Sequence, residues 1–176
     1  MGAVQKRYDI PARTFYYQPD WAPDGSALAF TDTDYNIWTV STSTGLAMKI
    51  DTDRYAHPNR TFNPTWSPDS RYLAYAKQQD SHFKSVFIHD TQAGTTHHVT
   101  QGLADIISPI FDQSGKYLYY LVSTDYGLTS GWLDMSSYDP SVTRSLFLTL
   151  LQEDGRSPLL PSSDDEEITE DEKDNS

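Results

Sequence analysis

Short apolar runs that alternate with polar residues recur along this chain, and several begin after a turn signal. Residues 27–30 read Ala-Leu-Ala-Phe and follow Pro-Asp-Gly, so Leu28 and Phe30 share one face while Ala27 and Ala29 share the other. Such alternation predicts β-strands, because successive side chains of a strand point to opposite sides. Further strands are predicted at 36–41, 46–51, 85–90, 95–100 and 145–151, with glycine turns at Gly45, Gly94 and Gly155.

The pattern repeats with a period of 45 residues, marked by Pro19, Pro64 and Pro109. Five further sets keep the same spacing: Trp21/Trp66/Phe111, Asp24/Asp69/Ser114, Gly25/Ser70/Gly115, Leu28/Leu73/Leu118 and Phe30/Tyr75/Tyr120. In each unit a short strand is expected to end at the Trp or Phe. The Pro-Asp-Gly chemistry then predicts a tight turn into the next strand, since proline presets φ and glycine accepts a positive φ.

Four short strands in a unit of about 40 to 50 residues are typical of a β-propeller blade. We therefore predict an all-β fold, a β-propeller fragment of about three four-stranded antiparallel blades whose ring is not closed. The predicted units are the last strand of a preceding blade (1–10), two blades (11–51 and 52–100), a partial blade (101–163) and an acidic disordered linker (164–176). Because open blades expose strand edges and apolar faces, we expect a longer parent protein.

The repeated residues are expected to be structural. Trp21, Trp66 and Phe111 are predicted to pack between blades, and Asp24 and Asp69 to fix the turns. Ser114 replaces the aspartate in the third unit, which predicts weaker turn chemistry there. The third unit also carries a long insertion at 123–144, and two prolines weaken its fourth strand.

Composition and charge narrow the function classes. The net charge is −12, and residues 164–174 contribute −7 of it through eight acids and one lysine. No nucleic-acid partner is expected, because a chain this acidic offers no basic surface to displace counterions. No run of about 18 apolar residues is present, so no membrane span is expected. With no cysteine, disulfides, thiol catalysis and cysteine metal sites are excluded.

Catalytic and metal-binding residue types occur without the spacing that such sites need. No G-x-S-x-G elbow is present, and Ser, His and Asp coexist in most chains without forming a triad. His97 and His98 are adjacent on a predicted strand, so they point to opposite faces. Solvated turn acids are the simpler interpretation of two further segments, Asp32-Thr-Asp34 and Asp51-Thr-Asp53, since an EF-hand's glycine and glutamate are missing. We expect no catalytic residue, metal site or cofactor in this chain.

Two aromatic stretches are candidate contact sites. Phe15-Tyr16-Tyr17 precedes the first innermost strand, where inter-blade packing is the simpler interpretation. The insertion in the third unit carries Tyr126, Trp132 and Tyr138, which are candidates for contact with a peptide or with a neighbouring domain. Long loops of repeat proteins often lie on a binding face, but the residues alone do not separate these two alternatives.

The repeats "WAPDGSALAF" and "WSPDSRYLAYAK" resemble the Trp-Ser-Pro-Asp-Gly (PD40) propeller repeats of TolB, of tricorn-type proteases and of dipeptidyl-peptidase propellers. The third unit contains "STDYGLTSGWLDMSS" and later "SPLLPSSDDEE", and it is similar to a propeller segment of bacterial tricorn-like proteases. The resemblance covers essentially all 176 residues. It implies a parent serine peptidase with N-terminal propellers, a PDZ-like domain and a C-terminal catalytic region whose motifs this chain lacks.

By this resemblance, the chain would be a noncatalytic propeller segment that guides or filters peptides toward that catalytic region. The implied partners are peptide substrates and the remaining blades and catalytic domains of a homo-oligomeric parent. The parent would be cytoplasmic, or periplasmic or exported if a signal lies upstream. A TolB-like protein–protein interaction module is the alternative function, and a self-contained hydrolase is a third hypothesis.

Overall fold

The computed structural model describes residues 7–10, 14–54, 62–126 and 142–160. These residues form eleven strands and no helix. The strands are β1 (Tyr16–Trp21), β2 (Ala27–Asp32), β3 (Asn36–Ser41), β4 (Ala47–Thr52), β5 (Thr65–Trp66), β6 (Tyr72–Gln78), β7 (Lys84–Asp90), β8 (Thr95–His98), β9 (Asp105–Phe111), β10 (Tyr117–Ser123) and β11 (Ser145–Leu150).

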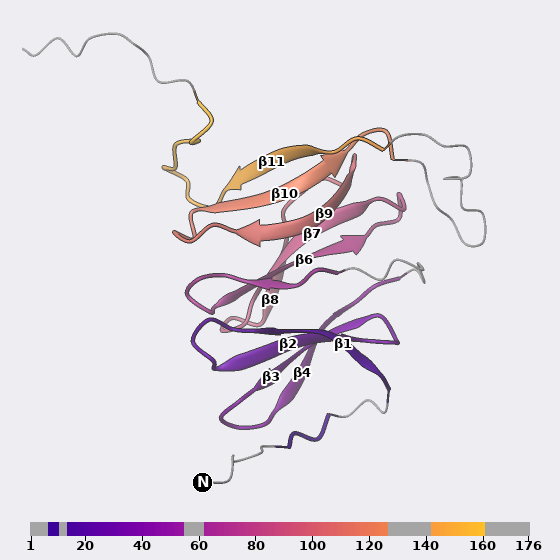
Figure 1. The fold of residues 1–176 in the computed structure, drawn as a ribbon, viewed down its shortest axis with the longest axis vertical. Coiled ribbons are helices and arrows are strands. Elements are labelled where there is room, and N and C mark those ends of the chain that lie inside the picture. Colours follow the sequence, from indigo (N-terminus) through magenta and orange to yellow (C-terminus); the bar gives the residue numbers. More distant parts are fainter. Residues whose placement is uncertain (1–6, 11–13, 55–61, 127–141, 161–176) are drawn as a thin grey trace, which may run out of the picture.

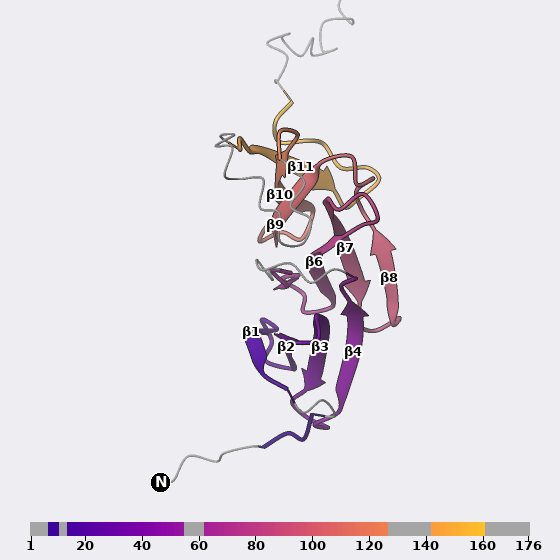
Figure 2. The same cartoon turned by 90° about the vertical axis from the view of Figure 1, so that its right-hand side faces the viewer.

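The strands form three antiparallel sheets stacked on one another (Figure 1). The first sheet has the order β1-β2-β3-β4, the second β5-β6-β7-β8 and the third β11-β10-β9. Seen from the side, β1 lies at one edge of the stack, while β4 and β8 lie at the other (Figure 2). Consecutive meander sheets stacked face to face are propeller blades, so the chain is all-β and forms part of a β-propeller. The described sheets do not close a ring.

The repeat predicted most strand positions closely. Three strands end at the repeated aromatic residues, as expected: Trp21, Trp66 and Phe111. Residues 7–10 form no strand, so the strand predicted within 1–10 stays a prediction for 1–6, which lie outside the described residues. Residues 151–160 add no fourth strand to the third sheet. The predicted linker 164–176 and most of the insertion lie outside the described residues.

The repeated turns have the expected hydrogen bonds. Gly25 has φ 71°, and its amide donates to the Ala22 carbonyl at 2.8 Å. Ser70 takes the same left-handed conformation with φ 62°, at the position where the first repeat has glycine. The Asp24 carboxylate accepts the Ser26 amide at 2.8 Å, and the Asp69 carboxylate likewise accepts the amide two residues further on, at 3.1 Å.

Asp112 offsets the weaker turn chemistry predicted for the third unit. Ser114 itself accepts the Lys116 amide at 3.3 Å, the longest of the three equivalent bonds. However, the Asp112 carboxylate accepts the amides of Ser114 and Tyr117, each at 2.9 Å. Two amides of the turn are therefore satisfied by a carboxylate that stands two residues before the repeat's aspartate position.

The core lies in the two spaces between the sheets. The first space contains Ala29, Ile37, Trp66, Leu73 and Tyr75, all buried. The second contains Ala74, Val86, Ile106, Leu118 and Tyr120. In both spaces a fully buried alanine of one sheet belongs to the same cluster as the Leu and Tyr of the next sheet. The alternation of small and large residues seen in the sequence is thus what allows one blade to fit against the next.

Polar contacts also fix the first sheet to the second. The Lys77 ammonium lies 2.7 Å from one oxygen of the Asp51 carboxylate, and the Tyr75 hydroxyl donates to the other oxygen at 2.7 Å. Burial raises the pKa of Tyr75, and the negative charge of Asp51 raises it further. Since Tyr75 and Lys77 both belong to β6, these contacts join β4 of the first sheet to β6 of the second.

Candidate binding groove on the innermost strands

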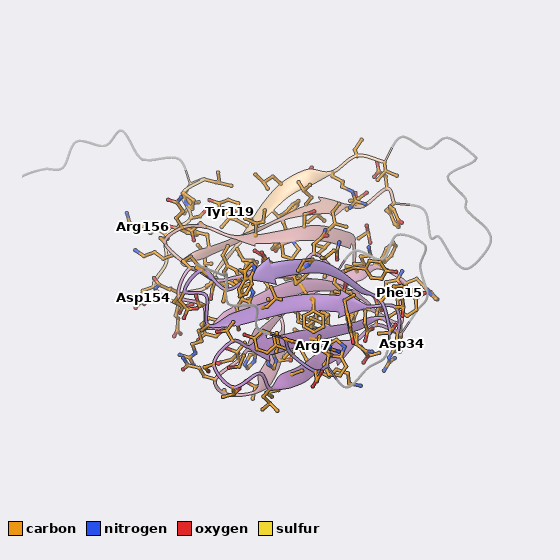
Figure 3. All side chains as sticks on the ribbon, turned by 60° about the horizontal axis from the view of Figure 1, so that its bottom comes forward. Arg7, Phe15, Asp34, Tyr119, Asp154 and Arg156 are labelled. Atoms are coloured by element: carbon orange, nitrogen blue, oxygen red, sulfur yellow. The ribbon has the colours of Figure 1, made fainter. Side chains whose placement is uncertain are left out.

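The first strands of the three sheets are neighbours. β5 contacts β1 on one side and β9 on the other. In a propeller the first strand of each blade faces the central axis, so these three strands form the innermost surface of the segment. Phe15 and Asp34 lie at one end of the strands, and Asp154 and Arg156 lie at the opposite end (Figure 3).

The same unusual backbone conformation recurs within β1, within β9 and just before β5. Gln18, Asn63 and Ser108 have φ values of 52°, 45° and 54°, and a proline follows each of them. A positive φ is uncommon for a residue other than glycine, and a residue that precedes proline normally adopts an extended conformation. The conformation recurs at the 45-residue spacing in all three units. It is therefore a built feature of the innermost strands.

The left-handed residue and its proline form a β-bulge. In the first sheet Tyr17 pairs with Thr31 and Asp20 with Ala29, so two residues of β1 stand opposite one residue of β2. β9 pairs with β10 in the same way: Ile107 with Leu121, and Ile110 with Tyr119. A bulge bends a strand and redirects a side chain, and bulges are frequent next to functional sites.

The second sheet repeats this offset. The Phe62 carbonyl accepts the Ala76 amide at 2.8 Å, and Thr65 pairs with Ala74. Asn63 and Pro64 thus stand opposite the single residue Tyr75.

These bulges border a groove of about 480 Å³, here called the inner groove. Its lining consists of three rows with one residue from each blade: a polar row (Gln18, Asn63, Ser108), a proline row (Pro19, Pro64, Pro109) and a graded row (Asp20, Thr65, Ile110). The Asn63 amide donates to the Ser108 hydroxyl at 3.3 Å, which ties two blades together along the polar row. Amide and hydroxyl groups both donate and accept, so the polar row can bind neutral main-chain groups.

Asp20 is the ionisable residue of this groove. It is half-buried, and that burial raises the pKa of its carboxyl, while a hydrogen bond from the Trp21 amide partly opposes the shift. Its backbone carbonyl accepts the indole N–H of Trp66 at 3.1 Å. Trp66 therefore fixes the position of Asp20 from the neighbouring blade.

A second cavity, of about 550 Å³, lies between the second and third sheets near the repeated turns. Both of its carboxylates already have partners. The Arg71 guanidinium lies 2.6 Å from Asp90, whose other oxygen accepts the amides of Gln92 and Ala93, and Asp69 accepts the Arg71 amide at 3.1 Å. The Arg71 guanidinium holds the pKa of Asp90 well below its usual range. Since both carboxylates are already hydrogen-bonded within the protein, this cavity is better explained as a gap between blades than as a ligand site.

The repeated tryptophans occupy different environments. Trp66 is 6% exposed and lies between the first and second sheets, whereas Trp21 is 58% exposed. Phe111 is half-buried between the second and third sheets. Trp21 stands on the outer side of the first sheet, where the described residues provide no preceding blade. The indole is consequently buried only where a blade precedes it.

The candidate contact residues of the insertion are only partly described. Tyr126 lies under the Arg144 guanidinium, 5.4 Å from the ring centre, and Arg144 pairs with Asp105 at 2.9 Å. Trp132 and Tyr138 lie outside the described residues, so the structure does not test whether the three aromatic residues meet. At the base of the insertion, Asp125 accepts the Thr143 amide at 3.0 Å.

Hydrogen bonds from Ser123 and Thr143 lower the pKa of Asp125 to about 2. The described ends of the insertion are therefore held together by a carboxylate that stays ionised.

Two turn acids are not the solvated groups that the sequence predicted. Asp32 is buried and accepts hydrogen bonds from the Trp38 indole at 2.8 Å and from the Asn36 amide at 2.9 Å. Burial opposes its ionisation, but these hydrogen bonds outweigh burial and lower its pKa. Asp51 bridges two sheets. Of the aromatic stretch 15–17, Phe15 is largely exposed, Tyr16 and Tyr17 are less than half exposed, and Tyr16 meets Phe30 edge-on at 5.3 Å.

Sequence reasoning missed the polar row, although a signal was present. Each repeat proline is preceded by a polar residue, in Gln18-Pro19, Asn63-Pro64 and Ser108-Pro109. Periodicity identified the prolines, but it did not reveal a left-handed residue, because a residue before proline is expected to be extended. Among the described residues, no three His, Cys, Asp or Glu side chains gather as a metal site requires. Nor do they include a helix long and apolar enough to cross a membrane.

Comparison with known proteins supports the propeller assignment. No protein-family profile matches the chain. The uncharacterised peptidase YuxL of Bacillus subtilis (strain 168) is 26% identical over 129 residues, which cover 68% of this chain and 19% of that protein. The crystal structure of the tricorn protease matches with a TM-score of 0.65 and 18% identity, over 81% of this chain and 14% of that one.

TolB from Acinetobacter baumannii matches with a TM-score of 0.50 and 18% identity, over 64% of this chain and 28% of its own. At these identities the structural likeness establishes the fold: the chain is a β-propeller segment of the kind found in tricorn protease and TolB. The chain spans only 19% of the length of YuxL and 14% of the tricorn protease chain.

Proposed function

We propose that this chain is a substrate-handling propeller segment of a tricorn-like serine peptidase, and that it guides peptides toward a catalytic region outside this sequence. The structural likeness to tricorn protease and the sequence likeness to the peptidase YuxL support this assignment. The proposed parent is a cytoplasmic homo-oligomer, and the partners of this segment are its other blades, its catalytic domains and the peptides in transit.

The inner groove is the observation that carries the proposal. Its polar row offers neutral donors and acceptors from three consecutive blades, and proline rings separate the rows. The polar row can hydrogen-bond the main chain of an extended peptide without selecting its side chains. Weak, sequence-tolerant binding of this kind suits a route that peptides must also leave.

A TolB-like interaction module is the second candidate, and the apolar outer face of the third sheet favours it. Leu146 and Leu150 are exposed on that face. Such a module would bind a folded protein through this surface, and peptides would not compete for the inner groove. The two functions therefore predict binding at different surfaces of the same chain.

Titration of the 176-residue chain with unrelated extended peptides, followed by NMR, tests the proposal. We expect shifts at Gln18, Asn63 and Ser108, and no peptide hydrolysis. Asn63→Gly removes the amide while keeping a residue that accepts φ 45°, so it should weaken binding about tenfold, or about 1.4 kcal/mol, without strain.

His82→Gly is the matched control, because His82 also has a positive φ (64°) but lies in the turn between β6 and β7. It should leave peptide binding unchanged. Equal binding by the parent chain and Asn63→Gly would refute a role for the polar row. Hydrolysis by the purified chain that a serine substitution abolishes would instead support a self-contained hydrolase.

A further inference from the structure

The graded row of the inner groove changes its chemistry from blade to blade. Asp20 stands on β1, Thr65 on β5 and Ile110 on β9, at equivalent repeat positions. Each pairs with the equivalent residue of the neighbouring strand, which is Ala29, Ala74 or Tyr119, so all three side chains face the same way on their sheets. The row therefore runs in one direction from a carboxylate through a hydroxyl to an aliphatic side chain.

The Asp20 end of the groove is suited to a cation. Asp20 is the only ionisable residue lining the described groove, and it takes part in none of the ion pairs found among the described residues. Burial raises the pKa of its carboxyl, as expected for a charge removed from water without an opposite charge nearby. An ammonium group bound in the groove would supply that opposite charge.

The Ile110 end is suited to an apolar group. Ile110 is 57% exposed at this end of the groove, whereas the adjacent Pro109 is fully buried. An apolar side chain of a ligand placed there removes the exposed surface of Ile110 from water, which favours binding. The two ends of the groove therefore select opposite chemical properties.

We propose that the inner groove binds an extended peptide in one direction, with an ammonium group at Asp20 and an apolar side chain at Ile110. Between these ends, Thr65 and the polar row contact neutral main-chain groups. The inference rests on the proposed function, that the groove carries peptides, and adds the chemistry and the direction of the ligand. The ammonium is either the free amino terminus or a lysine side chain, and both would pair with the same carboxylate.

Calorimetric titration of the full 176-residue chain with C-terminally amidated peptides distinguishes these sources. The first peptide has four alanines followed by two leucines and a free amino terminus; the second is the same peptide acetylated, and the third is acetylated with lysine in first place. We expect the free peptide to bind about tenfold more tightly than the acetylated one. If the acetylated lysine peptide binds as tightly as the free peptide, any ammonium group suffices. If it binds only as weakly as the acetylated peptide, the site recognises the α-amino group.

Asp20→Asn should abolish the difference between the free and acetylated peptides, since the amide keeps the shape and loses the charge. Asp24→Asn is the matched control, because it removes the same charge from an exposed turn of the same blade. A peptide of reversed sequence has the two leucines next to the free amino terminus, so its ammonium group and its apolar side chains lie at the same end. It should bind more weakly than the first peptide, and Ile110→Ser should remove that preference.

These outcomes test the directional groove separately from the proposed peptide-handling function. Equal binding of free and acetylated peptides, or an effect of acetylation that persists in Asp20→Asn, would overturn the directional groove and leave peptide handling intact. No binding of any of these peptides would overturn both. Circular dichroism of Asp20→Asn confirms that a lost preference does not arise from misfolding.

Discussion

At the scale of single residues, Trp21 and Trp66 show how context decides the role of a repeated side chain. Both end the first strand of a blade and precede the same turn. Trp66 is buried between two sheets and donates to the Asp20 carbonyl, whereas most of Trp21 contacts solvent. The same residue is thus a core residue in one blade and a surface residue in the other.

Trp66→Ala should destabilise the chain by about 3–5 kcal/mol, because it empties a buried volume and leaves the Asp20 carbonyl without its indole donor. Urea denaturation followed by far-UV circular dichroism measures the change. Trp21→Ala, at the equivalent position, should change stability by less than about 0.5 kcal/mol. Similar losses for both variants would show that Trp66 does not hold the two sheets together.

At the scale of elements, the sequence predicted the hairpins but not their bulges. Alternating residues such as Leu28 and Phe30 identify a strand and its faces, and Pro-Asp-Gly identifies a turn, because both signals are local. The left-handed conformation of Gln18 contradicts the local preference of a residue before proline, so a local rule does not predict the bulge that it forms against β2. The inner groove could not be predicted for the same reason, since it needs three strands from different sheets.

Asp112 illustrates the same limit within a turn. Its place two residues before Ser114 gave no signal, because the repeat has Ala22 and Ser67 there. Ser67 nevertheless accepts the Tyr72 amide at 2.8 Å, as Asp112 accepts the amide of Tyr117. A serine in one repeat and an aspartate in another thus accept the equivalent turn amide. A search for identical residues at a fixed spacing does not detect such an equivalence.

The contact of Tyr75 with Asp51 predicts a pH dependence of the interface between the first two sheets. An unfolded tyrosine loses its proton near pH 10, whereas burial and the nearby Asp51 raise the pKa of Tyr75 and keep it protonated in the folded chain. Above pH 10 the folded chain therefore binds a proton that the unfolded chain has lost, and stability falls as pH rises. The slope from this group approaches about 1.4 kcal/mol per pH unit.

Tyr75→Phe should flatten that slope, which urea denaturation between pH 8 and 11 measures. The variant should also be less stable at pH 7, by about 1.5–3 kcal/mol, because Asp51 loses a hydrogen bond to a charged acceptor. If the stability curves of the parent chain and the variant stay parallel above pH 10, the proton on Tyr75 does not contribute to the interface.

At the scale of the whole molecule, the third sheet departs from the packing rule of the first two. Ala29 and Ala74 are fully buried, and each gives space to the large side chains of the next blade. Tyr119 occupies the equivalent position on the outer side of the third sheet. A further blade with a large Leu and Tyr at the repeat positions would therefore not fit against Tyr119 at the same spacing. The outer face of the third sheet is apolar, as surfaces that bind another protein often are.

The outer face of the third sheet should make the isolated chain self-associate. Leu146 is 61% exposed on β11, and it lies on the same face as Tyr119 and Leu148. Burying these side chains against a second copy removes apolar surface from water, so sedimentation velocity should show association that increases with concentration. Leu146→Glu should shift the chain toward monomer. Thr95→Glu, with the same charge change on exposed β8, should not; equal sedimentation of both variants with the parent chain would assign association to another surface.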